Sequence, residues 1–321
     1  MFCRQPFYYT EIYENGDVFT CCPHFINNFS IGNIYKQDFE KIWNGKKIQK
    51  IRKNLLKDNF NLCSNSCIRK FISEEKTEKD TPIVENYPEE LSISSDNSCN
   101  INCKICRDNI HTVKQSNFKE DIDKYWLPVF KNAKLVRFGC TGEPFASKKE
   151  KYLIQKLAEI HPNIKFQFHT NGILGDKNLL KKLDVYNKID IMTVSLHSAT
   201  EETYNKTVIG GNYKKVMKNL KLYSEMKQDS LIKFFRLIFV VYSENYKDMR
   251  DFAKMAEKLD AEAQFWAYRK NDTEIGRNYE KYAITEKSHK EHNKLVKILK
   301  DDIFKSKNVV LYPELKALTE E

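Results

Sequence analysis

The sequence lacks any run of roughly 20 apolar residues, the length that a helix needs to span a bilayer. Residues 1–6 have neither the basic start nor the apolar stretch of a secretory signal. Low-complexity tracts and convincing repeats are also missing. We therefore expect a folded cytoplasmic protein with no membrane partner. Its 321 residues, 41% of them hydrophobic, can bury one full-sized core and a smaller appendage.

Cysteine is absent from the last 181 residues and clustered before them. The thiol pool of the cytoplasm keeps disulfides reduced, so clustered cysteines in such a protein indicate metal rather than a disulfide framework. Five cysteines lie within the first 67 residues, three follow within a stretch of eight residues, and one stands alone. They are Cys3, Cys21, Cys22, Cys63 and Cys67, then Cys99, Cys103 and Cys106, and finally Cys140.

Neither sign of charge is scarce, and the net charge of +10 comes from 54 Lys and Arg against 44 Asp and Glu. Basic and acidic residues are interspersed along most predicted helices, which is typical of a solvated, lysine-rich surface. Attraction for an anionic substrate or for nucleic acid is the alternative. Charge alone does not choose between them.

Residues 1–72 predict a small cysteine-rich α+β module. Strand-like residues 7–13 and 18–21 flank Asn15-Gly16, a strong hairpin signal. Apolar residues then recur at helical spacing, with Gly45 as the expected break. Residues 73–90 are charged, contain two prolines and predict a linker.

Beyond the linker, short apolar strands alternate with amphipathic helices. Six βα units in succession predict a parallel sheet, either an open doubly wound sheet or a barrel, and periodicity does not separate the two. We place this region at residues 91–270, followed by a carboxyl-terminal extension over 271–321 that packs across it. The predicted strands are residues 91–95, 135–138, 164–169, 189–196, 231–242 and 261–267.

The spacing C-x3-C-x2-C of Cys99, Cys103 and Cys106 begins where the first of these strands ends. Thiolates are the usual ligands of iron-sulfur clusters, and three of them leave one corner of a four-iron cubane open for a reactant. Ligand sites of parallel α/β folds collect at the carboxyl ends of strands. The alternative is a zinc knuckle that borrows a fourth ligand such as His111.

This triplet, with the apolar Ile105 before its last cysteine, resembles the signature of the radical S-adenosylmethionine (SAM) superfamily. Gly142, Glu143 and Pro144 after the second strand resemble the family's Gly-Glu-Pro motif, which contacts the SAM amino group. Thr170-Asn171-Gly172 and the stretch from Val194 to His197 end the third and fourth strands, as in relatives with an auxiliary domain called SPASM or twitch. The resemblance implies a partial (β/α)6 TIM-like barrel.

Further site residues follow from the same resemblance. Asn171 and Ser195 are expected to line the SAM site. Relatives often carry Asp where His197 stands, and an Arg near the position of Val208. The SAM carboxylate is therefore assigned to another group, such as Lys206 or Arg236.

The amino-terminal cysteines resemble the ligand pattern of a SPASM or twitch domain, which binds auxiliary 4Fe-4S clusters and in most relatives follows the barrel. Five cysteines suffice for one fully ligated cluster with one to spare. Neighbours on a strand point to opposite faces, so either Cys21 or Cys22 is a ligand, beside Cys3, Cys63 and Cys67. A structural zinc site of four cysteines is the alternative.

Three further side chains each have two possible roles. Single cysteines in strands are mostly small buried hydrophobes, which is the first reading of Cys140; a substrate-facing catalytic role is the second. His169 and His197 lie at polar strand ends. They are expected to be hydrogen-bonded residues of the site wall rather than metal ligands.

Together these features predict an enzyme that cleaves SAM reductively to a 5'-deoxyadenosyl radical. The radical would remove hydrogen from a peptide or a small sugar-like or aminocyclitol-like molecule. The expected cofactors are a SAM-binding 4Fe-4S cluster, one auxiliary 4Fe-4S cluster and SAM. The expected partners are the substrate and an electron donor such as flavodoxin or ferredoxin, and not nucleic acid. The alternative is a non-catalytic zinc- or iron-sulfur-containing nucleic-acid-binding module, in which the Gly-Glu-Pro and Thr-Asn-Gly placements have no role.

Overall fold

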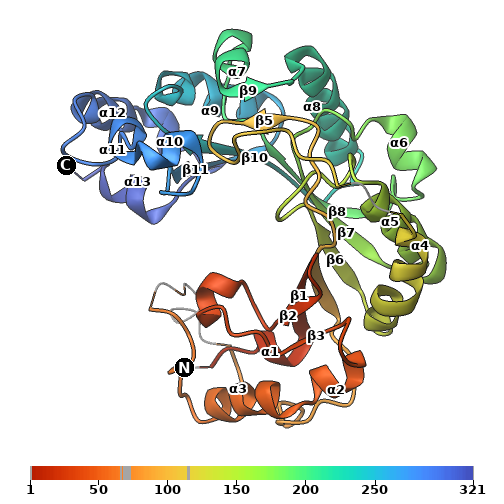
Figure 1. The fold of residues 1–321 in the computed structure, drawn as a ribbon. Coiled ribbons are helices and arrows are strands. Elements are labelled where there is room, and N and C mark those ends of the chain that lie inside the picture. Colours follow the sequence, from red (N-terminus) through yellow and green to blue (C-terminus); the bar gives the residue numbers. More distant parts are fainter. Residues whose placement is uncertain (1, 66, 68–73, 114–115, 321) are drawn as a thin grey trace. The chain divides into compact units, whose positions relative to one another are not determined.

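The chain divides into two units in the computed structural model, which describes residues 2–65, 67, 74–113 and 116–320 (Figure 1). The remaining positions of the proposed module, linker and extension lie outside the described residues. The first unit comprises Met1–Asn97, Val113–Gly142 and Ser147–Phe166. The second comprises Ser98–Thr112, Glu143–Ala146 and Gln167–Glu321.

The predicted hairpin opens the first unit. Strands β1 (Tyr9–Tyr13) and β2 (Asp17–Phe19) pair antiparallel, and β3 (Gly32–Asn33) extends them. The turn needs glycine, because Gly16 has φ +83° and an added Cβ would lie 2.4 Å from the Tyr35 ring. The hairpin prediction is confirmed.

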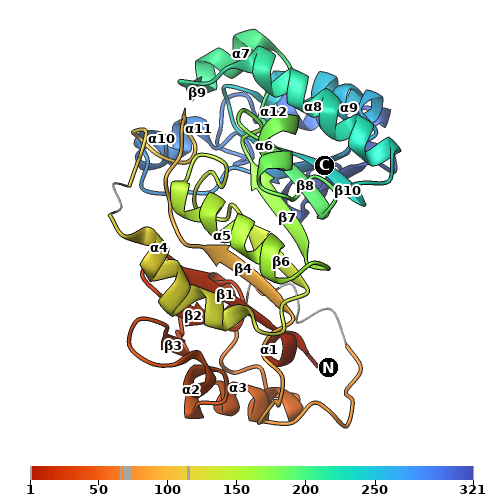
Figure 2. The same cartoon turned by 90° about the vertical axis from the view of Figure 1, so that its right-hand side faces the viewer.

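Strand β1 also pairs in parallel with β4 (Glu90–Ser94), from Tyr9 opposite Glu90 to Tyr13 opposite Ser94. On its other side β4 pairs in parallel with β6 (Leu135–Phe138), so the order in this unit is β6-β4-β1-β2-β3 (Figure 2). The amino-terminal segment is thus joined to the strand that precedes the cysteine triplet. Nothing in the sequence pattern predicts this pairing.

One helix boundary in the first unit lies where the sequence predicts it. Gly45 separates α2 (Phe39–Trp43) from α3 (Lys46–Leu56), as expected. The buried guanidinium of Arg52 on α3 donates to the carbonyl oxygens of Pro6 and Pro82, at 2.9 and 3.1 Å, and so anchors the linker. The other helical segments are α1 (Gln5–Tyr8), η1 (Pro23–Ile26), α4 (Phe118–Asp121), η3 (Ile122–Trp126), η4 (Leu127–Phe130) and α5 (Lys148–Ile160).

In the second unit the strands run in the order β12-β11-β10-β8-β7. Strand β10 pairs in parallel with β8 and β11, and β11 pairs in parallel with β12. The predicted strands are confirmed with boundaries shifted by a few residues, and the alternation of parallel strands with helices bears out the α/β class. The strands are β7 (Lys165–Thr170), which crosses from the first unit, β8 (Ile189–Ser195), β10 (Phe234–Val241), β11 (Glu262–Ala267) and β12 (Val309–Leu311).

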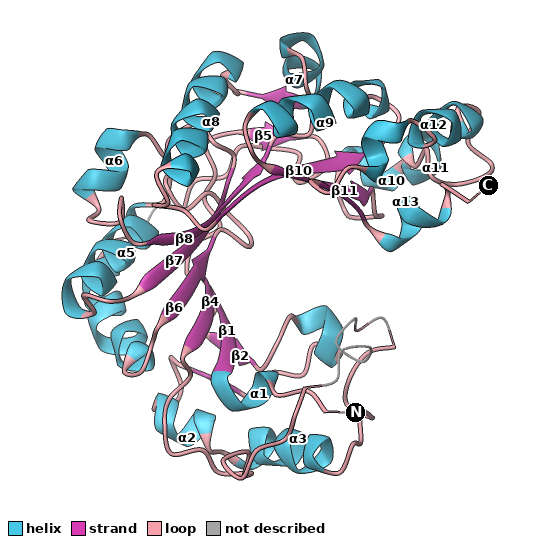
Figure 3. Ribbon diagram, turned by 180° about the vertical axis from the view of Figure 1, so that it is seen from behind, coloured by secondary structure: helices cyan, strands magenta, loops and turns pink. Residues whose placement is uncertain are grey.

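One face of this sheet is covered by helices and the other is half exposed. Helices α8 (Tyr213–Gln228) and α9 (Met249–Lys258) contact β10 (Figure 3). Alternate residues of β10 are buried, whereas those between them, from Arg236 to Val240, are half-buried. Arg236 is the polar side chain among these half-buried residues of β10.

Shorter elements complete the second unit. None of the helices in the described part of the chain is both long and apolar enough to cross a bilayer. The remaining elements are β5 (Asn102–Cys103), α6 (Lys177–Lys182), α7 (Glu201–Thr207), β9 (Val208–Ile209), η5 (Tyr246–Asp248), α10 (Glu274–Arg277), α11 (Tyr279–Tyr282), α12 (His292–Leu299), η6 (Asp302–Lys305) and α13 (Pro313–Ala317).

Candidate cofactor-binding site

The loop that carries the cysteine triplet is held by backbone hydrogen bonds. Strand β5, which ends at Cys103, pairs antiparallel with β9, so that Cys103 lies opposite Val208. The N–H of Cys99 donates to the carbonyl of His111 at 2.8 Å, and that of Cys106 to the carbonyl of Cys103 at 2.8 Å. Each cysteine is therefore fixed in place through its own backbone or a direct neighbour's.

The three thiols interact electrostatically. Burial raises the pKa of Cys103, and the neighbouring Cys106 and Cys99 raise it further. Burial alone would lower the pKa of Arg107, but its interactions with the three cysteines raise it. Such a set of soft donors beside one cation fits an iron-sulfur cluster, since bound iron stabilises thiolates that would otherwise repel one another.

Glu143 organises the strand ends around this loop. Its carboxylate is 1% exposed and accepts hydrogen bonds from the hydroxyl of Thr170 at 2.8 Å, the N–H of Asn171 at 2.7 Å and the N–H of Phe145 at 3.2 Å. Its own N–H donates to the carbonyl of Ser98 at 2.8 Å. Burial raises the pKa of Glu143 to about 7, although these donors lower it.

Asn171 links that network to the cysteines. Its amide nitrogen Nδ2 donates to Oδ1 of Asn100 at 2.9 Å and lies 3.8 Å from Sγ of Cys99. The next residue, Gly172, has φ +79°, and an added Cβ would lie 2.9 Å from Val194. Motifs separated by about 30 to 70 residues in the sequence therefore meet in one hydrogen-bonded group.

The two residues that flank Glu143 differ in their placement. Pro144 is buried, and Gly142 is the last residue of a segment that belongs to the first unit.

The polar ends of β7 and β8 carry two neutral histidines. His169 Nε2 and Ser195 Oγ are 2.5 Å apart, and His197 Nδ1 accepts from the N–H of Val240 at 3.1 Å. Burial lowers the pKa of His169 to about 4 and that of His197 to about 3, the latter also through His169. His197, with φ +61°, thus stands uncharged at the position where relatives often carry Asp.

The two cations considered for the SAM carboxylate both have carboxylate partners. Arg236 lies near the amino end of β10, with its Nε 3.2 Å from Oε1 of Glu262 on β11. Lys206 is paired at 2.6 Å with Glu202, one turn earlier on α7. Either side chain would have to leave its partner to bind another anion.

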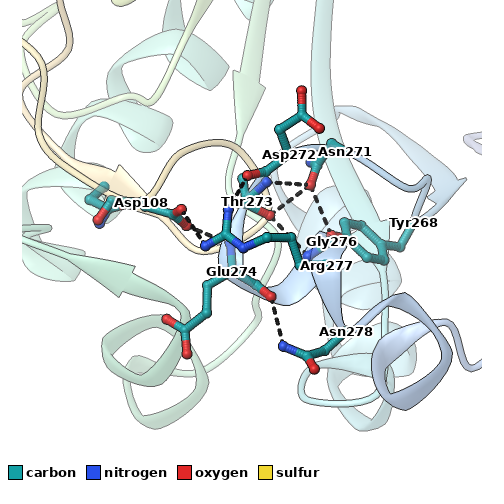
Figure 4. A network of polar contacts seen from close by, with 10 residues as sticks. Asp108, Tyr268, Asn271, Asp272, Thr273, Glu274, Gly276, Arg277 and Asn278 are labelled. Carbon is teal, nitrogen blue, oxygen red and sulfur yellow. Dashed lines mark hydrogen bonds and ion pairs between the residues drawn. The ribbon is translucent and has the colours of Figure 1, made fainter.

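The carboxyl-terminal segment is tied to the cysteine loop (Figure 4). Asp108 accepts hydrogen bonds from the N–H of Glu274 at 2.6 Å and from Nη2 of Arg277 at 3.0 Å. Asn271 Nδ2 donates to the carbonyl of Ile105 at 2.7 Å. The side chain of Ile105 packs against a cluster formed by Tyr242, Tyr268 and Ile275.

A second group of thiols lies in the first unit. Cys3, Cys21, Cys63 and Cys67 line one small pocket, whose other walls are mostly apolar; Cys22 is not among the lining residues. Burial raises the pKa of Cys21, and Glu11 and the other three cysteines raise it further. In the described part of the chain, no three His, Cys, Asp or Glu side chains are close enough to hold a single metal ion. The corners of a cubane, by contrast, spread its ligands over four irons.

Cys140 differs from its first interpretation. The expectation of a small buried cysteine is wrong, because Cys140 is exposed. Its Sγ lies 3.1 Å from Oγ of Ser92 on the neighbouring β4. Surrounding protein atoms and the nearby Glu11 raise the pKa of Cys140 to about 11, which keeps it a thiol at neutral pH. Glu11 in turn accepts hydrogen bonds from Tyr9 and Tyr13.

Several members of these networks were not singled out from the sequence. Thr170 could have been found as part of Thr170-Asn171-Gly172, whereas Asn100, Asn271 and Glu11 have no local signal. Their roles depend on contacts between segments far apart in the chain.

Comparison with known proteins agrees with both groups of cysteines. Residues 93–256, just over half of the chain, match the model of the Radical SAM superfamily. Residues 3–68 match the SPASM model, an iron-sulfur cluster-binding domain, so this domain lies at the amino terminus as expected. The two matches imply a SAM-binding 4Fe-4S cluster and an auxiliary iron-sulfur cluster. The mostly parallel sheet with alternating helices resembles the partial barrel of that superfamily.

No curated protein matches the chain. Among solved structures, anSMEcpe with bound AdoMet is 19% identical, with a TM-score of 0.46 over 69% of this chain and 63% of that one. The same protein with AdoMet and the Cp18Cys peptide is also 19% identical, with a TM-score of 0.44 over 69% of this chain and 62% of that one. Methylornithine synthase (PylB) is 11% identical, with a TM-score of 0.38 over 56% of this chain and 53% of that one. The chain thus spans less than two thirds of each of these proteins.

Proposed function

The chain belongs to the radical SAM superfamily, and from this membership we propose that it is an enzyme that cleaves SAM reductively at a 4Fe-4S cluster held by Cys99, Cys103 and Cys106. When bound, the cluster and SAM supply a 5'-deoxyadenosyl radical, which removes hydrogen from a C–H bond of the substrate. The observation that carries the proposal is the hydrogen-bonded group that joins the cysteine loop to Glu143 and Asn171.

The chain's own residues bind and position these groups. The β5–β9 pairing fixes Cys103, and Asn171 holds the loop beside Cys99. Glu143, whose pKa of about 7 leaves it partly ionised at neutral pH, is the acidic group assigned to the SAM ammonium. The neutral His169 and His197 line the strand ends without adding charge.

We assign the auxiliary cluster to Cys3, Cys21, Cys63 and Cys67. Their shared cavity favours Cys21 over Cys22 as the ligand from the hairpin. Its mostly apolar walls, which include Phe25 and Leu55, would keep water from the cluster.

The substrate is proposed to be a peptide or a small molecule, and a flavodoxin or ferredoxin is proposed as electron donor in the cytoplasm. The exposed thiol of Cys140 is proposed to face the substrate. The nucleic-acid-binding alternative is not favoured, because it gives no role to the contact of Glu143 with Thr170 and Asn171.

The decisive experiment is anaerobic reconstitution followed by reaction with SAM and dithionite. We expect a brown protein that forms 5'-deoxyadenosine, detected by liquid chromatography. The matched control replaces Cys99, Cys103 and Cys106 by Ala. This variant should keep the iron of the auxiliary cluster and form no 5'-deoxyadenosine. A colourless wild-type protein that holds zinc and forms no 5'-deoxyadenosine would refute the proposal.

A further inference from the structure

Helix α3 covers the pocket of the auxiliary thiols with one face and presents the opposite face to solvent. Ile51 and Leu55 line the pocket that the four proposed auxiliary ligands share. Ile48, one turn before Ile51, is also buried, so these apolar residues form the inner face of the helix. An α-helix is about 10–12 Å across, so about one helix thickness separates the thiol pocket from the outer surface of α3.

That outer surface carries a stripe of exposed lysines. They follow one another at spacings of four, three and four positions, which places them along one side of the helix, opposite Ile51 and Leu55. Neither α3 nor its two caps contain Asp or Glu. Within the described part of the chain, none of these ammonium groups pairs with a carboxylate. The residues of this α3 stripe are Lys46, Lys50, Lys53 and Lys57.

The stripe does not serve the stability of its own helix. Like charges three and four positions apart repel one another. Lys46 is the first residue of α3, where the helix dipole disfavours a cation. Other helices pair their lysines, as Lys206 does with Glu202 on α7 and Lys254 with Asp251 on α9. An acidic partner bound to the stripe would relieve the repulsion that α3 itself leaves uncompensated.

The chemistry of the stripe favours an acidic protein that binds briefly. Lysine carries a compact hydrated charge and makes no bidentate contact, so it steers a partner more than it fixes one geometry. The 11 residues of α3 span about 16 Å, which suits the small interfaces of transient electron-transfer complexes, below about 1,200 Å².

Two other classes of anionic partner fit the helix less well. Surfaces that bind single-stranded nucleic acid combine basic residues with aromatic rings on which bases stack, and α3 contains no aromatic residue. An amphipathic helix binds a membrane through its apolar face, whereas Ile48, Ile51 and Leu55 are buried within the first unit. Position over the thiol pocket and charge of one sign therefore point to a protein that carries electrons.

We propose that the α3 stripe is the docking surface of a small electron-carrier protein with an acidic surface, such as a flavodoxin, which exchanges one electron with the auxiliary cluster. In this exchange the reduced cluster loses one electron and the oxidised carrier gains it, and no bond forms or breaks. The inference rests on the proposed function, because it requires the auxiliary cluster to be present. It gives the proposed carrier a docking place on the first unit.

The test compares charge reversal on α3 with charge reversal on α8 in the full-length, reconstituted protein. Helix α8 is the matched control, because it also carries four exposed lysines but contacts β10 in the second unit. The probe is an oxidised flavodoxin of negative net charge, whose affinity is measured by anaerobic calorimetry at low and high salt. The α3 variant combines Lys46→Glu, Lys50→Glu, Lys53→Glu and Lys57→Glu. The α8 variant combines Lys214→Glu, Lys215→Glu, Lys218→Glu and Lys221→Glu.

We expect both variants to keep their iron and their circular dichroism spectrum. Flavodoxin should bind the α3 variant about tenfold more weakly than wild type at low salt, whereas the α8 variant should lose far less affinity. High salt should remove most of the difference between wild type and the α3 variant, because it screens exposed charges. Equal affinities of the two variants at low salt overturn the inference. Binding of an RNA oligonucleotide or of anionic lipid vesicles through the same lysines, in place of flavodoxin, also overturns it.

Stopped-flow spectroscopy tests the electron exchange itself. Protein in which Cys99, Cys103 and Cys106 are replaced by Ala should hold only the auxiliary cluster. When this protein is chemically reduced and mixed with oxidised flavodoxin, reduction of the flavin reports electron transfer from that cluster. The α3 substitutions in this background should slow the transfer about tenfold at low salt, and an unchanged rate overturns the inference. Wild-type protein that holds no auxiliary iron would instead refute the proposed auxiliary cluster.

Zero-length cross-linking covers the case in which the α3 variant fails to fold or to hold iron. A carbodiimide joins an ammonium group to a carboxylate in direct contact with it, and mass spectrometry identifies the lysine. In the complex of wild-type protein with flavodoxin, we expect cross-links from the α3 stripe at low salt and their loss at high salt. Cross-links confined to lysines of other elements overturn the inference without any variant.

Discussion

Replacing Glu143 by Gln tests the group that is proposed to bind the SAM ammonium. The carboxylate accepts from the Thr170 hydroxyl and from the N–H groups of Asn171 and Phe145. A glutamine offers one acceptor oxygen, and its NH2 group would face one of these donors. The variant therefore loses at least one hydrogen bond together with the charge assigned to the SAM ammonium.

The expected magnitude follows from that charge. A hydrogen bond to a charged group contributes about 1.5–3 kcal/mol and a neutral one about 0.5–1.5 kcal/mol. A difference of about 1.4 kcal/mol weakens binding about tenfold. We therefore expect Glu143→Gln to bind SAM about tenfold more weakly at pH 8 while it keeps its iron.

The pKa of Glu143, raised by burial to about 7, makes this loss depend on pH. About nine tenths of the carboxyl groups are ionised at pH 8 and about one tenth at pH 6. Wild-type affinity for SAM should accordingly rise with pH through 7, and the Gln variant should show no such rise. Stability has the opposite sign, because the raised pKa favours the protonated folded state. Its contribution is fully present below about pH 4.5 and is lost as pH rises through 7.

Anaerobic calorimetry at pH 6 and pH 8 gives the affinities, and an iron assay and circular dichroism establish that the variants are folded. Glu11→Gln is the matched control, since Glu11 is also a buried glutamate whose pKa burial raises, but it lies in the first unit. We expect the control to keep the affinity and pH dependence of the wild type. Unchanged SAM affinity of Glu143→Gln at pH 8 would remove Glu143 from the site.

Three further outcomes are expected. Replacing Cys63 and Cys67 together by Ala should lower the iron content from about eight to about four atoms per chain. It should also uncouple 5'-deoxyadenosine formation from product formation. A folded variant with about four irons that still forms the full amount of product would show that the auxiliary cluster is dispensable. Asn271→Ala should weaken SAM binding severalfold in calorimetry. Asn278→Ala, which loses only a hydrogen bond to the Glu274 carbonyl, should leave the SAM affinity unchanged. Equal SAM affinities of the two variants would contradict a role for the contact of Asn271 with Ile105. Cys140→Ala should keep its iron and its SAM cleavage in a chromatographic assay but lose product, and full product would exclude a substrate-facing role.

Local patterns predicted the strands and the first cluster because both depend on residues close together in the chain. Alternating or apolar runs identify strands, and the spacing of Cys99, Cys103 and Cys106 is typical of a cluster loop. The hairpin at Gly16 is of the same kind, because the turn itself requires glycine. Each of these features can be read within about ten residues.

Contacts between distant segments could not be predicted in this way. Asn271 reaches Ile105 across 166 positions, and no periodicity marks it. Cys140 was expected to be buried because most lone cysteines in strands are, yet the residue is exposed beside Ser92. Burial of a single side chain depends on what packs over it, which the strand's own pattern does not specify.

The position of the auxiliary module before the barrel has a structural explanation in the first unit. Strand β1 lies between Cys3 and Cys21 in the sequence, and it pairs in parallel with β4, the strand that leads toward the cysteine triplet. An adjacent strand can be supplied by an earlier or a later segment of the chain, because pairing depends on register and not on order. The register from Tyr9 opposite Glu90 to Tyr13 opposite Ser94 therefore places the module beside β4 although it precedes the barrel in sequence. It follows that substitutions that disturb this pairing should affect the auxiliary thiols before they affect the triplet, whose own loop is held by β9.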